Sequence, residues 1–134
     1  MLLLLDAQSF PAAGLEGKIT LALELREHAL AEGLTDAQLI FDPVLPNLTW
    51  PDAWEQVGEV VKAVRLLHGG ELWGEPARTM AGLSNLRSGL RHTYPLRVEE
   101  AALALLAGAG LSLALMDVLQ PGLMETVRVI NQTG

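Results

Sequence analysis

The residues best suited to chemistry directly follow short apolar runs. In the stretch AGLSNLRSGL, residues 81–90, the hydroxyl of Ser84 and the amide of Asn85 come at the end of such a run. Asp6, Asp42 and Asp117 follow three other runs in the same way. A carboxylate accepts hydrogen bonds in pairs, and an amide side chain stabilises a changing charge without being a strong acid. These residues are therefore candidates for binding a ligand, with turn formation and backbone capping as the alternative roles.

A cluster of positive charge follows Asn85. Residues 86–97 contain three of the nine basic residues of the chain, Arg87, Arg91 and Arg97, and no acidic residue. A planar guanidinium pairs with a carboxylate or a phosphate through parallel hydrogen bonds. The loop therefore predicts an anion site, and a solvated loop or a contact between subunits is the alternative.

The candidate residues are positioned by a unit that occurs four times, namely an apolar run, a polar residue, a loop and an amphipathic segment. The runs predict strands at Leu2–Leu5, Leu39–Phe41, Thr79–Leu83 and Leu111–Met116. Helical periodicity predicts helices at Lys18–Ala31, Asp52–Leu67, Val98–Leu106 and Leu123–Ile130. The inward-facing side chains of the first two helices are expected to be Leu21, Leu25, Ala29, Trp54, Val57, Val61 and Val64.

This alternation of strands and helices predicts an α/β fold with a parallel sheet, either doubly wound or barrel-like. All four polar residues or pairs fall at the carboxyl end of a strand, which favours a barrel. A complete (β/α)8 TIM barrel takes about 200 residues or more, so we predict that residues 1–134 form one half-barrel domain. If every crossover has the same hand, the helices cover one face of the sheet and leave the other face and two edges bare. We expect oligomerisation to complete the fold.

Four segments resemble a known family. The segments AQLIFDPVLPNL (37–48), AGLSNLRSGL (81–90), GAGLSLALMD (108–117) and INQTG (130–134) are similar to the C-terminal half of the pterin-binding methyltransferases. These enzymes share a barrel with dihydropteroate synthase, and the resemblance covers nearly the whole chain. Dihydropteroate synthase has a Ser-Arg-Lys type signature where this chain has Ser84-Asn85, and an Arg-x-His motif where it has Val129-Ile130-Asn131. The methyltransferase branch is therefore favoured.

The resemblance implies a function and roles for individual residues. Members of the branch transfer a methyl group from methyltetrahydrofolate to the cobalt of a corrinoid that is bound to a partner protein. Carried over, Asp42 hydrogen-bonds the pterin ring, and Asn85 is the catalytic residue that reaches the methyl-bearing nitrogen. The further substrate-binding candidates are Ser84, Arg87, Arg91, Asp6 and Asp117. Arg87 and Arg91 stand where family members have Ser and Pro. Because the family takes further pterin contacts from its first four strands, we expect the chain to be inactive alone.

Several alternatives for the partner and the function remain open. The missing half of the barrel is expected to come from a second copy of the chain or from a separate chain that supplies the N-terminal half. A homodimer that binds a pterin or another small anionic ligand without turnover is one alternative to an enzyme component, and a truncated relic is another.

Composition argues against several kinds of partner and against a metal site. The net charge of −7 argues against nucleic acid or an anionic membrane as the partner. There are no cysteines, and the three histidines share no metal-ligand spacing, so we expect no metal. Residues 1–5 lack the basic start of a secretory signal, and a cytoplasmic location is expected.

Overall fold

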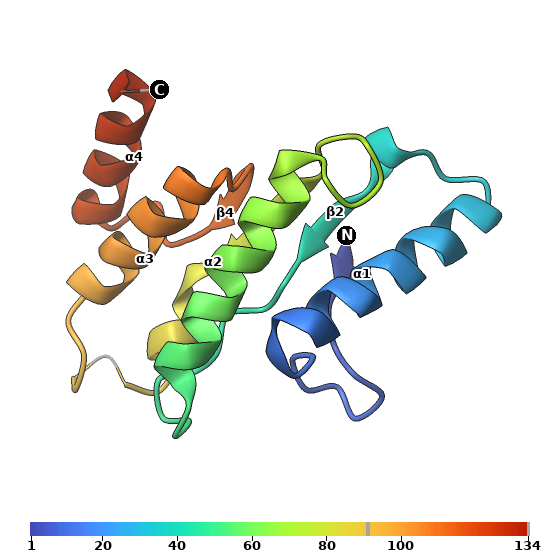
Figure 1. Ribbon diagram of the computed structural model, residues 1–134. Coiled ribbons are helices and arrows are strands. Elements are labelled where there is room, and N and C mark those ends of the chain that lie inside the picture. The colour runs from blue at the N-terminus through green and yellow to red at the C-terminus, as the bar shows by residue number, and fades with distance from the viewer. Residues whose placement is uncertain (91, 134) are drawn as a thin grey trace.

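A computed structural model describes residues 1–90 and 92–133 (Figure 1). Strands and helices alternate in the order β1 (Leu2–Leu3), α1 (Gly14–Ala31), β2 (Ile40–Asp42), α2 (Ala53–Gly69), β3 (Arg78–Gly82), α3 (Arg97–Ala109), β4 (Leu113–Leu115) and α4 (Pro121–Thr133). Two 3-10 turns, η1 (Asp36–Gln38) and η2 (Leu83–Arg87), lie in the connections. Every strand and helix predicted from the sequence is present, with its ends moved by a few residues.

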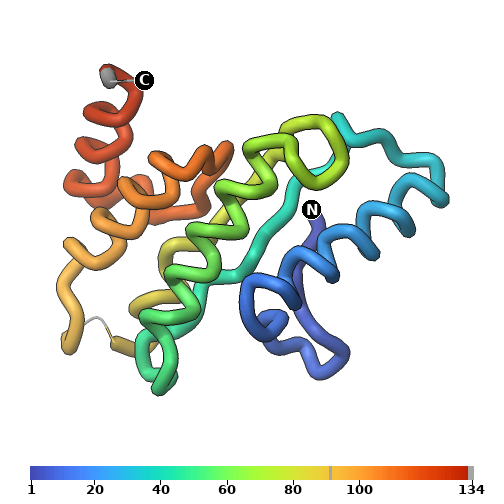
Figure 2. Tube along the Cα trace, in the orientation of Figure 1, coloured from blue at the N-terminus to red at the C-terminus, as the bar shows by residue number. Residues whose placement is uncertain are grey.

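The four strands form one parallel sheet in the order β1-β2-β3-β4. Leu3 lies opposite Asp42 in the register of β1 and β2, and Met80 lies opposite Leu113 in that of β3 and β4. The tube trace follows the units side by side in chain order (Figure 2), and α1, α2 and α3 lie over the same face of the sheet (Figure 1). This is the arrangement of four βα units in half of a barrel, as the sequence predicted.

Glycines end α2 and α3. Gly70 is the C-cap of α2 with φ 76°, and Gly110 is the C-cap of α3 with φ 107°, a left-handed region that side chains rarely adopt. A Cβ atom at Gly110 would also overlap the imidazole of His68. The uncharged stretch 101–116 therefore forms the end of α3, a turn and β4.

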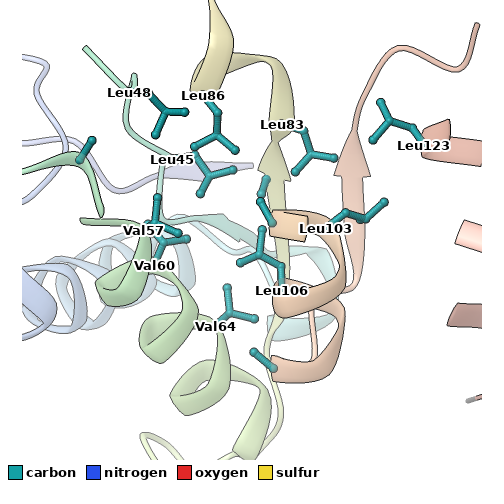
Figure 3. Close-up of a cluster of buried hydrophobic side chains, with 14 residues drawn as sticks. Leu45, Leu48, Val57, Val60, Val64, Leu83, Leu86, Leu103, Leu106 and Leu123 are labelled. Atoms are coloured by element: carbon teal, nitrogen blue, oxygen red, sulfur yellow. The ribbon is translucent and has the colours of Figure 1, made fainter. Parts of the chain in front are cut away.

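The helical face of the sheet carries the hydrophobic core, which consists of two clusters. The larger cluster joins α2, α3, β3 and η2 through aliphatic side chains that include Val60, Leu83 and Leu106, each fully buried (Figure 3). Burial of one such side chain contributes roughly 1.5–3 kcal/mol. The smaller cluster packs Leu4 and Phe41 against α1 and α2. The core therefore holds the strands in place, and with them the loops that follow the carboxyl ends of the strands.

The prediction that Trp54 faces inward was wrong, because this side chain is 62% exposed. The buried stripe of α2 consists of Ala53, Val57, Val60, Ala63, Val64 and Leu67. At about 100° per residue, Trp54 lies roughly 120° from the middle of that stripe. The stripe is offset from the predicted one, and Val61 at its margin is only partly buried.

The face of the sheet opposite α1, α2 and α3 carries exposed side chains, and β1 and β4 form the two edges of the sheet. Side chains alternate between the two faces of a strand, and Phe41 and Ala81 pack with the helices. The register therefore places a different set of side chains on what we call the open face, namely Leu3, Ile40, Asp42, Arg78, Met80, Leu113 and Leu115. Asp42 and Met80 are only 9% and 8% exposed, whereas Arg78 is exposed and donates to the carbonyl of Ala37. Leu3 is 42%, Leu113 48% and Leu115 60% exposed.

None of the helices in residues 1–90 and 92–133 has the length and apolar character needed to cross a membrane.

Candidate ligand-binding site

Asp42 ends β2 at the carboxyl edge of the sheet and is 9% exposed. Its Oδ1 accepts a hydrogen bond from the amide of Val44 at 2.9 Å, which is the turn-forming role that the sequence left open. Within the described residues no hydrogen bond reaches its Oδ2. Burial raises the pKa of the Asp42 carboxyl, and the Val44 hydrogen bond and the charge of Lys18 oppose that shift. The Val44 amide thus fixes the orientation of the Asp42 carboxylate, and its Oδ2 remains a spare acceptor for a further hydrogen bond.

Lys18 is a buried cation beside this carboxylate that the sequence analysis did not identify. The side chain lies on α1, is 1% exposed, and donates from Nζ to the carbonyl of Pro43 at 3.0 Å. Burial lowers the pKa of Lys18, while Glu59 and Asp42 act in the opposite direction. Val44 adopts φ 64°, a left-handed conformation that is strained for a β-branched residue. Lys18 therefore helps to hold the strained turn that follows Asp42.

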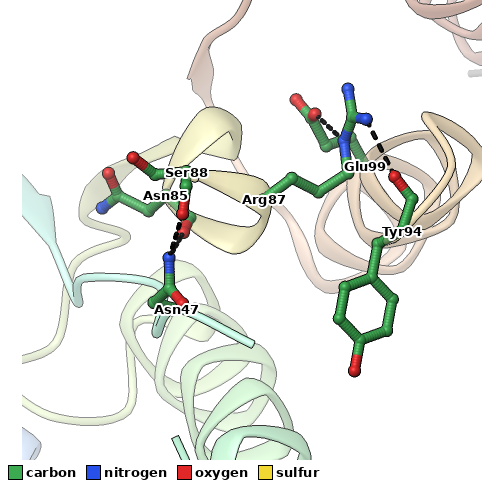
Figure 4. A network of polar contacts seen from close by, with 6 residues as sticks. All are labelled: Asn47, Asn85, Arg87, Ser88, Tyr94 and Glu99. Atoms are coloured by element: carbon green, nitrogen blue, oxygen red, sulfur yellow. Dashed lines mark hydrogen bonds and ion pairs between the residues drawn. The ribbon is translucent and has the colours of Figure 1, made fainter. Parts of the chain in front are cut away.

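Asn47 connects the loop after β2 to the turn after β3. Its Nδ2 donates to the carbonyls of Asn85 at 3.1 Å and Ser88 at 2.9 Å (Figure 4). Its Oδ1 accepts from the amide of Thr49 at 2.9 Å and from the Thr49 hydroxyl at 2.6 Å. The backbone amide of Leu48 adds a further bond to this turn. The side chain of Asn47 thus fixes two neighbouring strand-end loops relative to each other.

Asn85 lines a pocket of 350 Å³ at the carboxyl edge of the sheet. The loops after β1, β2 and β3 all contribute to its lining, which is formed by Leu5, Ser9, Phe10, Pro11, Val44, Leu45, Asn47, Trp50, Asn85 and Ser88. Asn85 is exposed, and its Nδ2 donates to the carbonyl of Leu45 at 3.5 Å. The pocket is mostly apolar with a few polar groups, which is typical of small-molecule sites.

Arg87 does not extend into this pocket. Its Nε pairs with the carboxylate of Glu99 on α3, and its Nη1 donates to the carbonyl of Tyr94 at 3.0 Å (Figure 4). The side chains of Arg87 and Glu99 are only 11% and 6% exposed. Residues 86–97 contain no acid, but the fold brings Glu99 to them, so the positive charge of Arg87 is matched within the protein.

The other predicted site residues do not join Asn85. Ser84, Arg87 and Asp117 line a separate cavity of 50 Å³. Asp117 and Asp6 accept hydrogen bonds from amides of their own loops, Asp117 from Leu119 at 2.9 Å and Asp6 from Gln8 at 2.9 Å and Phe10 at 3.0 Å. Both carboxylates therefore stabilise local turns. Arg91 lies outside the residues that the structure describes.

No group of three or more His, Asp or Glu side chains in the described part of the chain is arranged to hold a metal ion. The fold and the pocket define a half-barrel α/β protein whose polar residues gather at the carboxyl ends of its strands. No model of a known protein family matches the chain, and no curated protein matches it significantly.

Proposed function

We propose that this chain is the pterin-binding half of a methyl-transfer system that moves a methyl group from methyltetrahydrofolate to a corrinoid on a partner protein, and that it is incomplete alone. One observation carries the proposal. The loops after three successive strands line an open pocket that contains Asn85, and Asp42 ends the strand beside it with a spare acceptor. In barrel enzymes the active site lies at this end of the sheet.

The chemistry of these side chains suits the proposed ligand. Oδ1 of Asp42 is oriented by the Val44 amide, so Oδ2 can accept from the amide-like donors on the edge of a pterin ring. Methyl transfer from a tertiary amine requires the leaving nitrogen to gain positive character, and the amide of Asn85 would stabilise that change. The corrinoid supplies the methyl acceptor, and the residues of this chain position the donor.

The alternative of a binding module for another small anion has less support. Arg87, its main candidate ligand, is already paired with Glu99. A relic without function is distinguished from the proposed role by whether the pocket binds a pterin.

Calorimetric titration with methyltetrahydrofolate tests the proposal. Asp42→Asn is the sharpest variant, because an amide oxygen can still accept from the Val44 amide while the negative charge is lost. Hydrogen bonds to charged groups contribute about 1.5–3 kcal/mol, so we expect binding to weaken by at least about tenfold. Asn85→Ala is expected to weaken it as well.

Asp117→Asn is the matched control for Asp42→Asn. Asp117 also follows a strand and also accepts from the amide two residues further on at 2.9 Å. Neither carboxylate lines the pocket itself, but Asp42 lies two residues before Val44, which does, whereas Asp117 lines the separate cavity of 50 Å³. We expect this variant to bind like the wild type. Failure of the folded wild type to bind, or equal losses in the two Asp variants, would contradict the proposal.

A further inference from the structure

The chain exposes more surface than its size requires. A compact monomer of this mass, 14.4 kDa, is expected to expose about 6,800 Å², whereas this chain exposes 7757 Å². The excess of roughly 900 Å² is close to the approximately 800 Å² that each partner buries in a protein interface of standard size. The surplus is therefore large enough for one stable subunit interface.

The edges of the sheet show where that interface lies. β1 and β4 are the two edge strands, and their exposed leucines, Leu3, Leu113 and Leu115, lie on the open face. Natural edge strands are protected by charged residues, Pro or bulges. Residues 1–5 and 111–116 contain no charge and no Pro. Both edges therefore lack charge and Pro, and their protection rests on the shortness of β1 and β4, which have two and three residues, and on the bridge from Leu5 to Pro11.

We propose that a second copy of this chain covers the open face, and that β4 of each copy pairs in parallel with β1 of the other. Four strands are half of the eight in a closed (β/α)8 barrel, so two copies related by a two-fold axis complete it through two identical junctions. The aliphatic side chains of the open face then fill the barrel interior, as such residues typically do, and Arg78 lies at the amino-terminal end of β3.

Closure also brings the end helices together. In the closed ring, α4 of one copy lies next to α1 of the other. Both helices carry exposed apolar side chains, Leu23 on α1 and Met124 and Val129 on α4. Apolar surface is therefore available at the helical layer as well as in the sheet.

The closed barrel makes the candidate site a shared one. Because all the strands are parallel, the carboxyl ends of both copies face the same mouth, which would contain two Asp42 and two Asn85 side chains. Each copy then supplies the half of the mouth that the other lacks. The role of this mouth in pterin binding rests on the proposed function, whereas the pairing of strands does not.

Light scattering combined with one matched pair of variants tests the interface. Two chains of 14.4 kDa give an expected mass of 28.8 kDa. Leu115→Lys places a charge on the open face and is expected to give a folded monomer by circular dichroism. Leu105→Lys changes a leucine of similar exposure, 58%, beside Trp54 in a pocket on the helical side, and is expected to remain dimeric.

Cysteine crosslinking distinguishes a closed barrel from two stacked sheets. The chain has no cysteine, so Leu3→Cys can be introduced alone and together with Ala109→Cys, Leu113→Cys or Asp117→Cys, each of which can also be introduced alone. A shear of eight in an eight-stranded barrel offsets the register by four residues in each half, so the partner of Leu3 is expected about four residues from Leu113. Within one chain, β1 and β4 are three strand spacings apart, about 14 Å, which is too far for a disulfide that needs Cα atoms within about 7 Å. Barrel closure predicts that mild oxidation links one of the double variants into a covalent dimer and leaves the single variants monomeric on a non-reducing gel.

Three results would overturn the inference. A folded wild-type monomer would leave a separate chain as the cover of the open face. Dissociation by Leu105→Lys but not by Leu115→Lys would move the interface to the helices. Single-cysteine variants that crosslink as well as the double variants would indicate stacked sheets. A closed dimer that does not bind methyltetrahydrofolate would refute the proposed function alone.

Discussion

Removing one member of the Arg87–Glu99 ion pair is expected to destabilise the protein far more than removing both. The two side chains are 11% and 6% exposed, so a single replacement leaves an uncompensated charge in a largely dry site. Such losses cost about 3–5 kcal/mol for full burial. Because Arg87 retains some access to solvent, we expect Arg87→Met and Glu99→Met each to lower the free energy of unfolding by about 2–3 kcal/mol.

The double variant is the informative measurement. With both charges replaced by apolar side chains of similar length, the remaining loss is the hydrogen bond from Arg87 to the carbonyl of Tyr94. That bond is worth about 1 kcal/mol. The coupling energy between the two positions should therefore be about 3–5 kcal/mol.

Urea unfolding followed by circular dichroism measures these free energies, with an unchanged m-value as the check that only stability has changed. The Glu125–Arg128 pair on α4 is the control, because its side chains are 59% and 56% exposed. The same set of variants there should show little coupling. If the Arg87–Glu99 coupling is no larger than that of the control pair, the ion pair does not hold this loop and Arg87 is available to bind an anion after all.

Two further outcomes follow from single residues. Because the pKa of Asp42 is raised in the folded protein, this carboxyl favours folding when it is protonated. That contribution is lost as the pH rises through the folded-state pKa. Calorimetry should therefore give Asp42→Asn a higher Tm than the wild type at about pH 8, and the difference should shrink toward about pH 4. A Tm difference that grows on acidification would contradict the assigned direction. Gly110→Ala introduces a Cβ at φ 107° that overlaps His68, and should cost about 2 kcal/mol or more of unfolding free energy. His68→Ala should recover part of this loss in the double variant, and a Gly110→Ala protein as stable as the wild type would show that the turn can rearrange.

The architecture could be predicted from the sequence because each element carries a local signal. The uncharged stretch 101–116 contains Gly108 and Gly110 between helical periodicity and an apolar run, and it forms α3, a turn and β4. Sequential strand order then follows from the handedness of the crossovers. The position of Trp54 was not predictable in this way, because the buried stripe of α2 is set by the orientation of the helix on the sheet.

The polar contacts of the site were harder to predict, because they join residues that are far apart in the sequence. Asn47 and Ser88 are 41 positions apart, and Lys18 and Pro43 are 25 apart. Glu99 belongs to α3, outside the loop that it neutralises. Only Lys18 carried a usable signal, since it lies three residues before Leu21 and therefore on the apolar stripe predicted for its helix.

The hydrogen bonds that arrange the pocket lie within one chain. Asn47, Lys18 and the Val44 amide fix the strand-end loops through hydrogen bonds within this one chain. Asp42 lies on the open face, but the exposed leucines of that face, Leu3, Leu113 and Leu115, contribute no ligand-binding group. Closure of the barrel should therefore add stability and a second set of binding groups without rearranging the first. It follows that a variant such as Leu115→Lys should separate the two copies while each keeps its own half of the pocket, so that any loss of binding in it measures what the second half contributes.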